Sequence, residues 1–335
     1  GNTRAHVRRR QFIVLISAAA VSPTLARAQP AAALSDDYPV RPVTILCPYA
    51  AGGGTDILAR ILSQGLSERF GKPFIVEDRP GAGTMIAANM AAKAAPDGYT
   101  LLMGTSTPLA INATLHAKLP YDPVRDFVPL ALVADVPSVL VVNPSVPVRT
   151  TGELIKFAKA NPNKLSFGSS GPGSPHHLTM ELFKTMTGTE LMHVPYKGSV
   201  SALTDVVAGV IPLMFVGLAP SLNLIRAGSV RALGVSSKTL VPELPDGPPI
   251  ADDVPGFEAV AWQMLVAPAA TPGPVVDKLH EALREIEAQP EIKRKIKQLG
   301  MIPIDTPPVA DMQTYIKSEV ARWGRVVQKS GASVD

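Results

Sequence analysis

The sequence predicts an α/β fold of two lobes joined by two hinge crossovers. Apolar strand-like runs alternate with amphipathic helical runs along the chain, which predicts mainly parallel sheets with helices on both faces. Two long β-rich runs, residues 128–143 and 258–268, interrupt this alternation and suit the crossovers. We therefore expect a discontinuous first lobe, residues 38–137 and 262–335, and a second lobe, residues 138–261. Two crossovers make a hinge, and a hinge implies a cleft that can close.

The first lobe begins with an apolar strand, VTILCPY, at residues 43–49. Thr55 or Asp56 can cap the helix that follows, and apolar residues at spacings of three and four continue it to Gly71. The other elements expected before the crossover are the strand FIVED at 74–78, a small-residue helix at 86–95, the strand YTLLMG at 99–104 and a loop, TSTPLAIN, at 105–112.

The second lobe shows the same alternation. Its expected helices are residues 151–160, 175–187, 199–208 and 220–227, and its expected strands are KLSFGS, ELMHVPY, PLMF and VRALGVS. After the run at 258–268, three mainly helical patterns continue to the end of the chain.

The first 28 residues are typical of a secretory signal peptide. They contain five arginines and no acidic residue, an apolar core at residues 12–21, and the small-x-small pattern Ala26-Arg27-Ala28. We expect cleavage near Ala28 and a periplasmic protein. The apolar core is well short of the roughly 20 residues that cross a bilayer, so we expect no stable membrane insertion.

Removing this segment changes the charge of the protein. The whole chain has 32 basic and 28 acidic residues, and the segment carries five of the basic ones. The remainder, 27 against 28, is close to neutral, so the sequence does not predict nucleic acid as a partner. The single cysteine, Cys47, lies in an apolar strand and is expected to be a small buried side chain.

Four glycine-containing turns follow expected strands, at residues 50–56, 80–84, 104–107 and 169–174. In open α/β sheets ligands bind beyond the carboxyl ends of the strands, where helix N-termini present bare N–H groups. We expect the four turns to face one cleft and to hold an anion. Hydroxyl donors come from Thr55, Ser106, Thr107, Ser169, Ser170 and Ser174.

A nucleotide is a weaker alternative to a carboxylate. The pattern GxxxxGK[ST] is absent, and Ile57 stands where GxGxxG requires its last glycine. Glu77 or Asp78 could still act as the ribose-binding acid, so this alternative stays open. Asp56 is either a plain acid at a helix start or the partner of a ligand ammonium or hydroxyl group.

Metal and catalytic motifs are not found. His176 and His177 are adjacent on an expected helix and have no third ligand at a suitable spacing, so we expect no metal site and no cofactor. There is no GxSxG and no HExxH motif, and we assign no catalytic residue. Lys197 is the one cation expected near the cleft.

Several segments together resemble one family. "YPVRPVTILCPYAAGGGTDILAR", "EDRPGAGT", "FGSSGPGSPHHL", "HVPYKG" and the final "ARWGRVV" are similar to the tripartite tricarboxylate transporter substrate-binding receptors, or Bug solute-binding proteins, over about residues 38–330. The resemblance implies a periplasmic type II (Venus-flytrap) binding protein that closes on small carboxylates and serves a membrane permease. It implies ligand contacts for Tyr49, Ala51, Gly52, Gly53, Thr55, Asp56, Ser106, Thr107, Ser170, Ser174 and His177.

The chain departs from the family pattern at three positions. Val216 stands where relatives usually carry an acid, Gly217 follows it, and Leu109 replaces a frequent histidine. If Val216 and Gly217 line the ligand, the wall is less polar and roomier. This favours a carboxylate with an apolar or aromatic portion.

The predicted function is therefore a non-enzymatic solute receptor. The alternative from another class is an exported α/β hydrolase or oxidoreductase that uses the same loops. A third reading is a sensor whose bound form contacts a signalling receptor instead of a permease.

Overall fold

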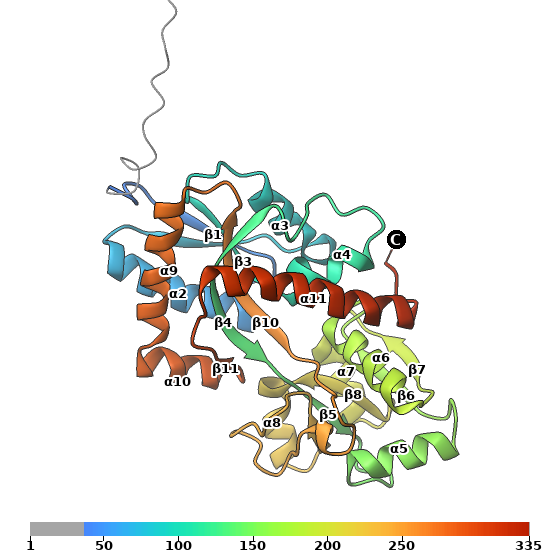
Figure 1. Ribbon diagram of the computed structural model, residues 1–335. Helices are drawn as coiled ribbons and strands as arrows, with labels where there is room; N and C mark the ends of the chain where they lie inside the picture. Colours follow the sequence, from blue (N-terminus) through green and yellow to red (C-terminus); the bar gives the residue numbers. More distant parts are fainter. Residues whose placement is uncertain (1–36, 335) are drawn as a thin grey trace, which may run out of the picture.

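A computed structural model of the chain describes residues 37–334 and shows two lobes. Each lobe has its own sheet; strand β4 (Phe127–Val136) runs from the first lobe towards the second, and strand β10 (Ala261–Pro268) returns beside it (Figure 1). The predicted signal peptide, residues 1–28, lies outside the described residues. The lobe boundaries drawn from the sequence stay a prediction.

The first-lobe sheet has the order β11-β4-β10-β3-β1-β2. β1 pairs in parallel with β2 and β3, whereas β10 pairs antiparallel with both β3 and β4. β1 (Val43–Cys47) is buried on both faces, and Cys47 at its end is a buried free thiol, as predicted. The bounds of the remaining strands are β1 Val43–Cys47, β2 Phe74–Asp78, β3 Thr100–Thr105 and β11 Ile302–Pro303.

The second-lobe sheet has the order β7-β6-β8-β5-β9. β6 pairs in parallel with β7 and β8, and β5 pairs antiparallel with β8 and β9. The bounds of its strands are β5 Ser138–Val142, β6 Ser166–Ser169, β7 Met192–Pro195, β8 Leu213–Gly217 and β9 Arg231–Val235.

The prediction of mainly parallel sheets is wrong, because both sheets are mixed. The chain leaves the first lobe on β4 and returns on β10, and these neighbouring strands must then run in opposite directions. β5 enters the second sheet as the direct continuation of β4, so it too lies antiparallel to its neighbours. Periodicity along one strand carries no information about the direction of its neighbour.

Helices cover both sheets. In α2 the residues Leu58, Leu62 and Leu66 form one buried stripe, and Gly71 ends the helix with a φ of 64° that favours glycine. The first-lobe helices are α2 Gly54–Phe70, α3 Met85–Ala92, α4 Asn112–Leu115, α9 Gly273–Glu287, α10 Pro290–Gln298 and α11 Val309–Ser330. The second-lobe helices are α5 Thr151–Ala160, α6 Pro175–Thr187, α7 Ser199–Val207 and α8 Leu218–Arg226.

The expected loop TSTPLAIN is helical instead. A π-helical turn, η2, covers Thr107–Ile111 and runs directly into α4, and every residue from 105 to 112 is buried. The prediction was wrong because the segment contains proline and two threonines, which favour turns. Proline is tolerated in the first turn of a helix, and burial of Leu109 and Ile111 decides the conformation here.

The two crossovers lie side by side and are hydrogen bonded to each other. Only Pro137 separates β4 from β5, and the N–H of Ser138 donates to Ser236 Oγ at 2.9 Å. Ser236, which directly follows β9, in turn donates its N–H to the carbonyl of Ser138 at 2.8 Å, and its own carbonyl accepts the N–H of Ala259, just before β10, at 3.1 Å. β4 and β10 also pair directly, Val136 with Ala261 and Asp135 with Trp262. These bonds join the segments that must bend together when the lobes move.

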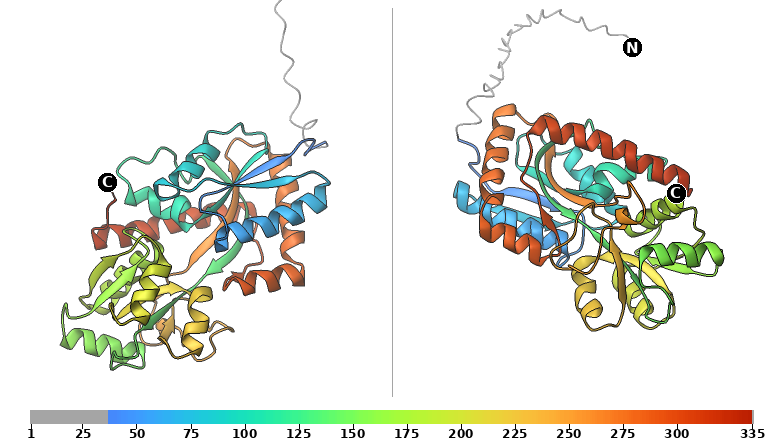
Figure 2. Two further views of the ribbon diagram at one scale, coloured as in Figure 1. Left: turned by 180° about the vertical axis from the view of Figure 1, so that it is seen from behind. Right: turned by 60° about the horizontal axis from the view of Figure 1, so that its bottom comes forward.

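The long helix α11 lies against both lobes (Figure 2). It contacts α4 and η2 of the first lobe and α6 of the second, and it contributes Ile316 and Trp323 to a hydrophobic core that both lobes share. Glu319, buried on the same helix, accepts hydrogen bonds from the indole N–H groups of Trp262 at 2.9 Å and Trp323 at 3.2 Å. α11 therefore holds the returning crossover strand β10 in place.

Candidate functional site

A cavity of about 390 Å³ lies between the lobes beside the crossovers; we call it the first cavity. The first lobe contributes the start of α2, the end of β3 and the turn before β11, and the second lobe contributes the starts of α6, α7 and α8. Its volume suits a small organic molecule. It is lined by Tyr49, Gly54, Thr55, Thr105, Ser106, Thr107, Val136, Ser138, Ser170, Pro175, His176, Ser199, Gly217, Leu218, Ala219, Pro220, Ala261, Trp262, Gln263, Leu299, Gly300 and Met301.

Four helices begin at this cavity. The first residues of α2, α6, α7 and α8 all belong to its lining: Gly54, Pro175, Ser199 and Leu218. The N–H groups at the start of a helix have no partner within the helix, and the aligned peptide dipoles place a partial positive charge there. The glycine caps of α2, α7 and α8 provide no side-chain hydrogen bond to these groups. The cavity is therefore suited to an anion.

The lining of the first cavity contains no lysine, arginine, aspartate or glutamate among the described residues. Its polarity comes from peptide groups and neutral side chains. The hydroxyl of Ser106, a residue with no exposed surface, has no hydrogen-bond partner. The side-chain oxygen of Gln263 also has none. The Gln263 amide N–H donates to Thr55 Oγ1 at 3.1 Å, which links the returning strand β10 to the start of α2. An unpaired buried hydroxyl is costly unless a ligand pairs with it.

A second cavity, of about 660 Å³, adjoins the first. The two share four lining residues: Tyr49, Thr107, Ser170 and Pro175. Residues of all four glycine turns line one cavity or the other, as the sequence predicts. The second cavity is lined by Tyr49, Ala82, Gly83, Thr84, Met85, Thr107, Asn112, Leu115, His116, Ser170, Pro172, Gly173, Ser174, Pro175 and Val334.

Tyr49 and His176 are the titratable groups at the first cavity, and both are neutral near pH 7. The hydroxyl of Tyr49 forms a hydrogen bond with Thr105 Oγ1 at 3.0 Å, and burial raises its pKa. Nδ1 of His176 lies 2.9 Å from Ser170 Oγ, and burial lowers the pKa of His176 to about 4. His176 therefore orients the Ser170 hydroxyl without bringing a positive charge.

The structure brings about half of the predicted ligand residues together. Seven line a cavity: Tyr49, Thr55, Ser106, Thr107, Ser170, Ser174 and Gly217. Six line neither cavity: Ala51, Gly52, Gly53, Asp56, His177 and Val216. Lys197 is exposed and also lies outside both linings.

The carboxylate of Asp56 is turned to its own loop. It accepts the N–H of Gly52 at 2.7 Å and pairs with Arg60 at 2.7 Å, and Arg60 also pairs with Asp78 at 3.0 Å. Burial raises the pKa of Asp56, but the Gly52 N–H and the Arg60 guanidinium outweigh it and hold the pKa below its usual value. Asp56 thus fixes the shape of the turn that carries Thr55.

His177 supports the glycine turn of the second lobe in a similar way. Its Nδ1 accepts the N–H of Gly173 at 3.0 Å, and its ring stacks on His193 with centroids 3.9 Å apart. Nε2 of His193 lies 2.6 Å from Ser169 Oγ, and Ser169 Oγ also contacts the backbone of Gly171. The two stacked histidines therefore stabilise the turn through its backbone and Ser169, and neither ring lines a cavity.

Val216 and Leu109 are fully buried in hydrophobic cores. Side chains alternate along β8, so Val216 points into the second lobe while Gly217 reaches the first cavity. The departure from the family pattern at these two positions therefore changes the cores and not the walls of the cavities.

Sequence reasoning missed several lining residues. His176 stands out in the sequence only as a candidate metal ligand, but its place in the first turn of α6, after a glycine turn, is a usable signal for the cleft. Gln263 had a usable signal, because it is the one strongly polar side chain in the run AVAWQMLVAP. Gly300 and Met301 carried no signal, since they reach the cleft only through the packing of α10 and β11.

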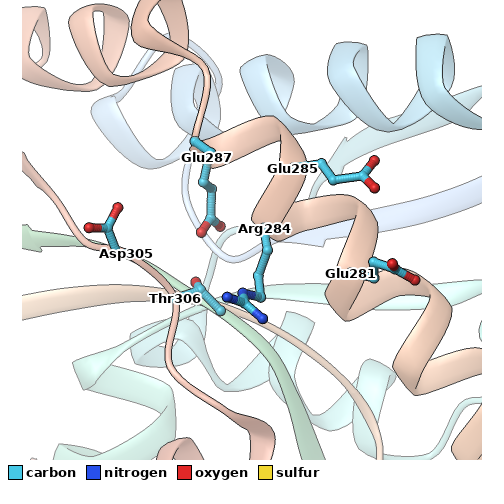
Figure 3. A pocket seen from close by; sticks show the side chains of 7 residues that line it. Glu281, Arg284, Glu285, Glu287, Asp305 and Thr306 are labelled. Carbon is cyan, nitrogen blue, oxygen red and sulfur yellow. The ribbon is translucent and has the colours of Figure 1, made fainter.

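A third cavity, of about 520 Å³, lies away from the cleft at the end of α9 (Figure 3). Arg284 and Glu287 extend from α9 towards Thr306, whereas Glu281 and Glu285 point away from them. The lining contains four acidic side chains and one arginine, and even with the buried Glu287 protonated an anion would meet mainly like charges. This cavity is not a suitable site for a carboxylate.

Comparison with known proteins shows the family to which the chain belongs. Residues 58–332 match the tripartite tricarboxylate transporter family receptor. The chain is 40% identical over 296 residues to the UPF0065 protein in the tcbD-tcbE intergenic region of Pseudomonas sp. strain P51, covering 87% of each chain. It is 35% identical to protein BugT of Bordetella pertussis, covering 90% of this chain and 92% of BugT.

Solved structures of similar fold include proteins with bound carboxylates. R. palustris Rpa4515 with adipate has a TM-score of 0.78 and 37% identity, covering 89% of this chain and all of that one. MatC from Rhodopseudomonas palustris with bound malate has a TM-score of 0.73 and 30% identity, covering 87% of this chain and all of MatC.

A two-lobed α/β fold whose cleft is lined by helix N-termini defines a solute-binding receptor of the periplasmic binding-protein class. The chain belongs to the tripartite tricarboxylate transporter family of receptors, which includes the Bug proteins. It is a receptor and not an enzyme, so the hydrolase or oxidoreductase alternative is set aside.

Two further features bear on partners. Among the described helices, none combines the length and apolar character that spanning a membrane requires. Within residues 37–334 no group of histidine, cysteine and acidic side chains is arranged to hold a metal ion.

Proposed function

We propose that the protein captures a small organic carboxylate in the first cavity and carries it to a membrane permease. The observation that supports this most strongly is the start of four helices around one uncharged cavity. Peptide N–H groups and dipoles recognise a carboxylate without a fixed cation. The adipate and malate bound by structural relatives are chemically consistent with this assignment.

The energies suffice for a receptor. Hydrogen bonds to a charged group contribute about 1.5 to 3 kcal/mol each, and micromolar affinity needs about 8 kcal/mol. Four or five bonds therefore meet the requirement. We assign them to the peptide groups at the helix starts and to the hydroxyls of Thr55, Ser106 and Ser170. Thr107 and Gly217 complete the wall of the first cavity, and Ser174 lines the adjoining second cavity.

Closure is part of the proposal. Contacts from both lobes meet at the first cavity, so a ligand that touches both binds the closed form more tightly than the open form and shifts the population towards it. The closed form would dock on the permease. We further propose that residues 1–28 direct export to the periplasm, with cleavage near Ala28, and that the lobes divide at residues 137 and 262.

The Ser106 hydroxyl offers a direct test. Because it has no partner in the free protein, Ser106→Ala should leave the melting temperature almost unchanged. Losing one bond to a charged group should weaken carboxylate binding by at least tenfold in a calorimetric titration. Ser318→Ala, at an exposed hydroxyl on α11, is the matched control and should bind normally. Equal affinities in both variants would contradict the assigned site.

A further inference from the structure

We propose that the second cavity receives the uncharged, mainly apolar body of an elongated carboxylate whose charged end lies in the first cavity. This inference rests on the proposed function and specifies the class of ligand. The preferred ligand would be a monocarboxylate with a chain or ring of several carbon atoms, and its far end would be neutral. A short, highly polar acid would leave the second cavity empty.

The connection between the cavities comes first. Tyr49 and Thr107 from the first lobe and Ser170 and Pro175 from the second belong to both linings, so one molecule can occupy both spaces. The lobes are in close contact here. A Cβ on Gly173 would come within 2.3 Å of the Leu115 side chain, so the glycine turn of the second lobe packs directly on α4 of the first. A ligand body at this place is held by both lobes.

The walls of the second cavity are suited to an apolar body. Six lining residues are apolar and larger than glycine: Ala82, Met85, Leu115, Pro172, Pro175 and Val334. The described lining contains no lysine, arginine, aspartate or glutamate. Four helices start at the first cavity, whereas the second shares the start of α6 and adds those of α3 and of the short α4, which continues η2 without a break. The hydroxyls of Thr84 and Ser174 and the imidazole of His116 also lie in this lining. Without a lysine, an arginine or a ring of helix starts, a second carboxylate would lose its hydration and gain less than the first.

The turn before α3 is built into this wall. Ala82, Gly83 and Thr84 have successive φ values of 46°, 59° and 77°, and two of the three are not glycine. Such a left-handed run costs free energy and persists only where the surroundings hold it. Asn112 provides the support, since its amide N–H group donates to the carbonyl of Gly83 at 2.9 Å. The strained turn places Ala82 and Met85 at the cavity.

The amide oxygen of Asn112 gives a clue to the far end of the ligand. Its amide nitrogen is committed to Gly83, and its oxygen is buried without a hydrogen-bond partner. An acceptor of this kind repels a carboxylate and favours a donor such as a hydroxyl or amide. Since the lining also has no aspartate or glutamate to balance a cation, the far end is uncharged and at most a hydrogen-bond donor.

Calorimetric titration with three matched series tests this inference. The series are straight-chain monocarboxylates of four to ten carbons, the α,ω-dicarboxylates of the same lengths, and the ω-hydroxy acids. We expect affinity for the monocarboxylates to rise up to about fourfold per methylene until the second cavity is full. Each dicarboxylate should bind at least tenfold more weakly than the monocarboxylate of equal length, and the hydroxy acids should bind as well as the monocarboxylates.

Other outcomes are informative in different ways. Affinity that does not change with length, or dicarboxylates that bind more tightly, would overturn the inference while leaving the carboxylate receptor intact. If none of the acids binds, the proposed function itself fails.

Variants at Met85 locate the effect. Met85→Gln should weaken octanoate binding at least tenfold and leave butyrate binding unchanged, whereas Met85→Leu should keep the dependence on chain length. Met90→Gln is the matched control, because Met90 lies on the same helix, is 42% exposed and lines neither cavity. A Met85→Gln protein that loses butyrate and octanoate equally would contradict a separate role for the second cavity.

Discussion

Glu287 should make the protein less stable as the pH rises, and Glu287→Gln should remove this penalty. The side chain is 3% exposed, and neither carboxylate oxygen has a hydrogen-bond partner. Burial raises the pKa of Glu287 from 4.5 to about 8; the neighbouring Thr306 hydroxyl opposes the shift, Asp305 adds to it, and Arg284 and Lys293 oppose it. The carboxyl is thus neutral in the folded protein at pH 7 and ionised in the unfolded chain.

The sign and size follow from proton linkage. Between pH 4.5 and 8 the folded state binds a proton that the unfolded state has released, so the free energy of unfolding falls as the pH rises and levels off above 8. At about 1.4 kcal/mol per pH unit, the penalty is about 3 kcal/mol at pH 7. Glutamine never ionises, so the variant should gain about 3 kcal/mol more over the wild type at pH 8 than at pH 5, or roughly 5 to 10 °C in melting temperature.

Thermal unfolding at pH 5 and pH 8 measures this difference. Glu285→Gln is the control on the same helix, because Glu285 is half exposed and pairs with Arg69. It should leave the slope of stability in this pH window nearly unchanged. If Glu287→Gln changes the melting temperature equally at both pH values, the carboxyl is not held neutral by burial.

Two further predictions concern the frame around the cleft. Glu319→Ala should lower the free energy of unfolding by about 3 kcal/mol, because the buried indole N–H groups of Trp262 and Trp323 lose their acceptor. Chemical unfolding followed by tryptophan fluorescence measures this loss. Glu291→Ala, at an exposed side chain, should change the free energy of unfolding little, and equal losses in the two variants would refute this role of Glu319. Gly300→Ala should weaken ligand binding at least tenfold, since its Cβ would lie 2.8 Å from the Ala219 nitrogen across the cleft. Gly331→Ala is the control, because Gly331 has a similar positive φ but free space around it, and this variant should bind the ligand normally. Equal losses of affinity in the two variants would assign the effect to backbone strain.

Much of the fold was readable from the sequence because its causes are local. The helices at 151–160 and 175–187 have the predicted bounds, since Thr150 and Ser174 cap them with side-chain hydrogen bonds and the apolar spacing is regular. Strand direction and the helix within TSTPLAIN were missed because they depend on neighbours distant in the sequence.

The site was predicted in outline for the same reason. Glycine turns after strands indicate where helix N-termini meet, and Thr55, Ser106 and Ser170 lie at the cleft. Asp56 and His177 belong to turns at the cleft, as predicted, but their side chains do not face the ligand, because each one accepts a hydrogen bond from a glycine N–H of its own turn. The contributions of Gly300 and Met301 depend on tertiary packing that no local pattern encodes.

The most direct measurement of the central claim is a crystal structure of the protein with the monocarboxylate that binds most tightly. We predict a carboxylate in the first cavity within hydrogen-bond distance of peptide N–H groups at the starts of α2 and α8, with its body directed towards Met85. A carboxylate bound elsewhere, or one held by a lysine or arginine side chain instead of helix N-termini, would contradict the account.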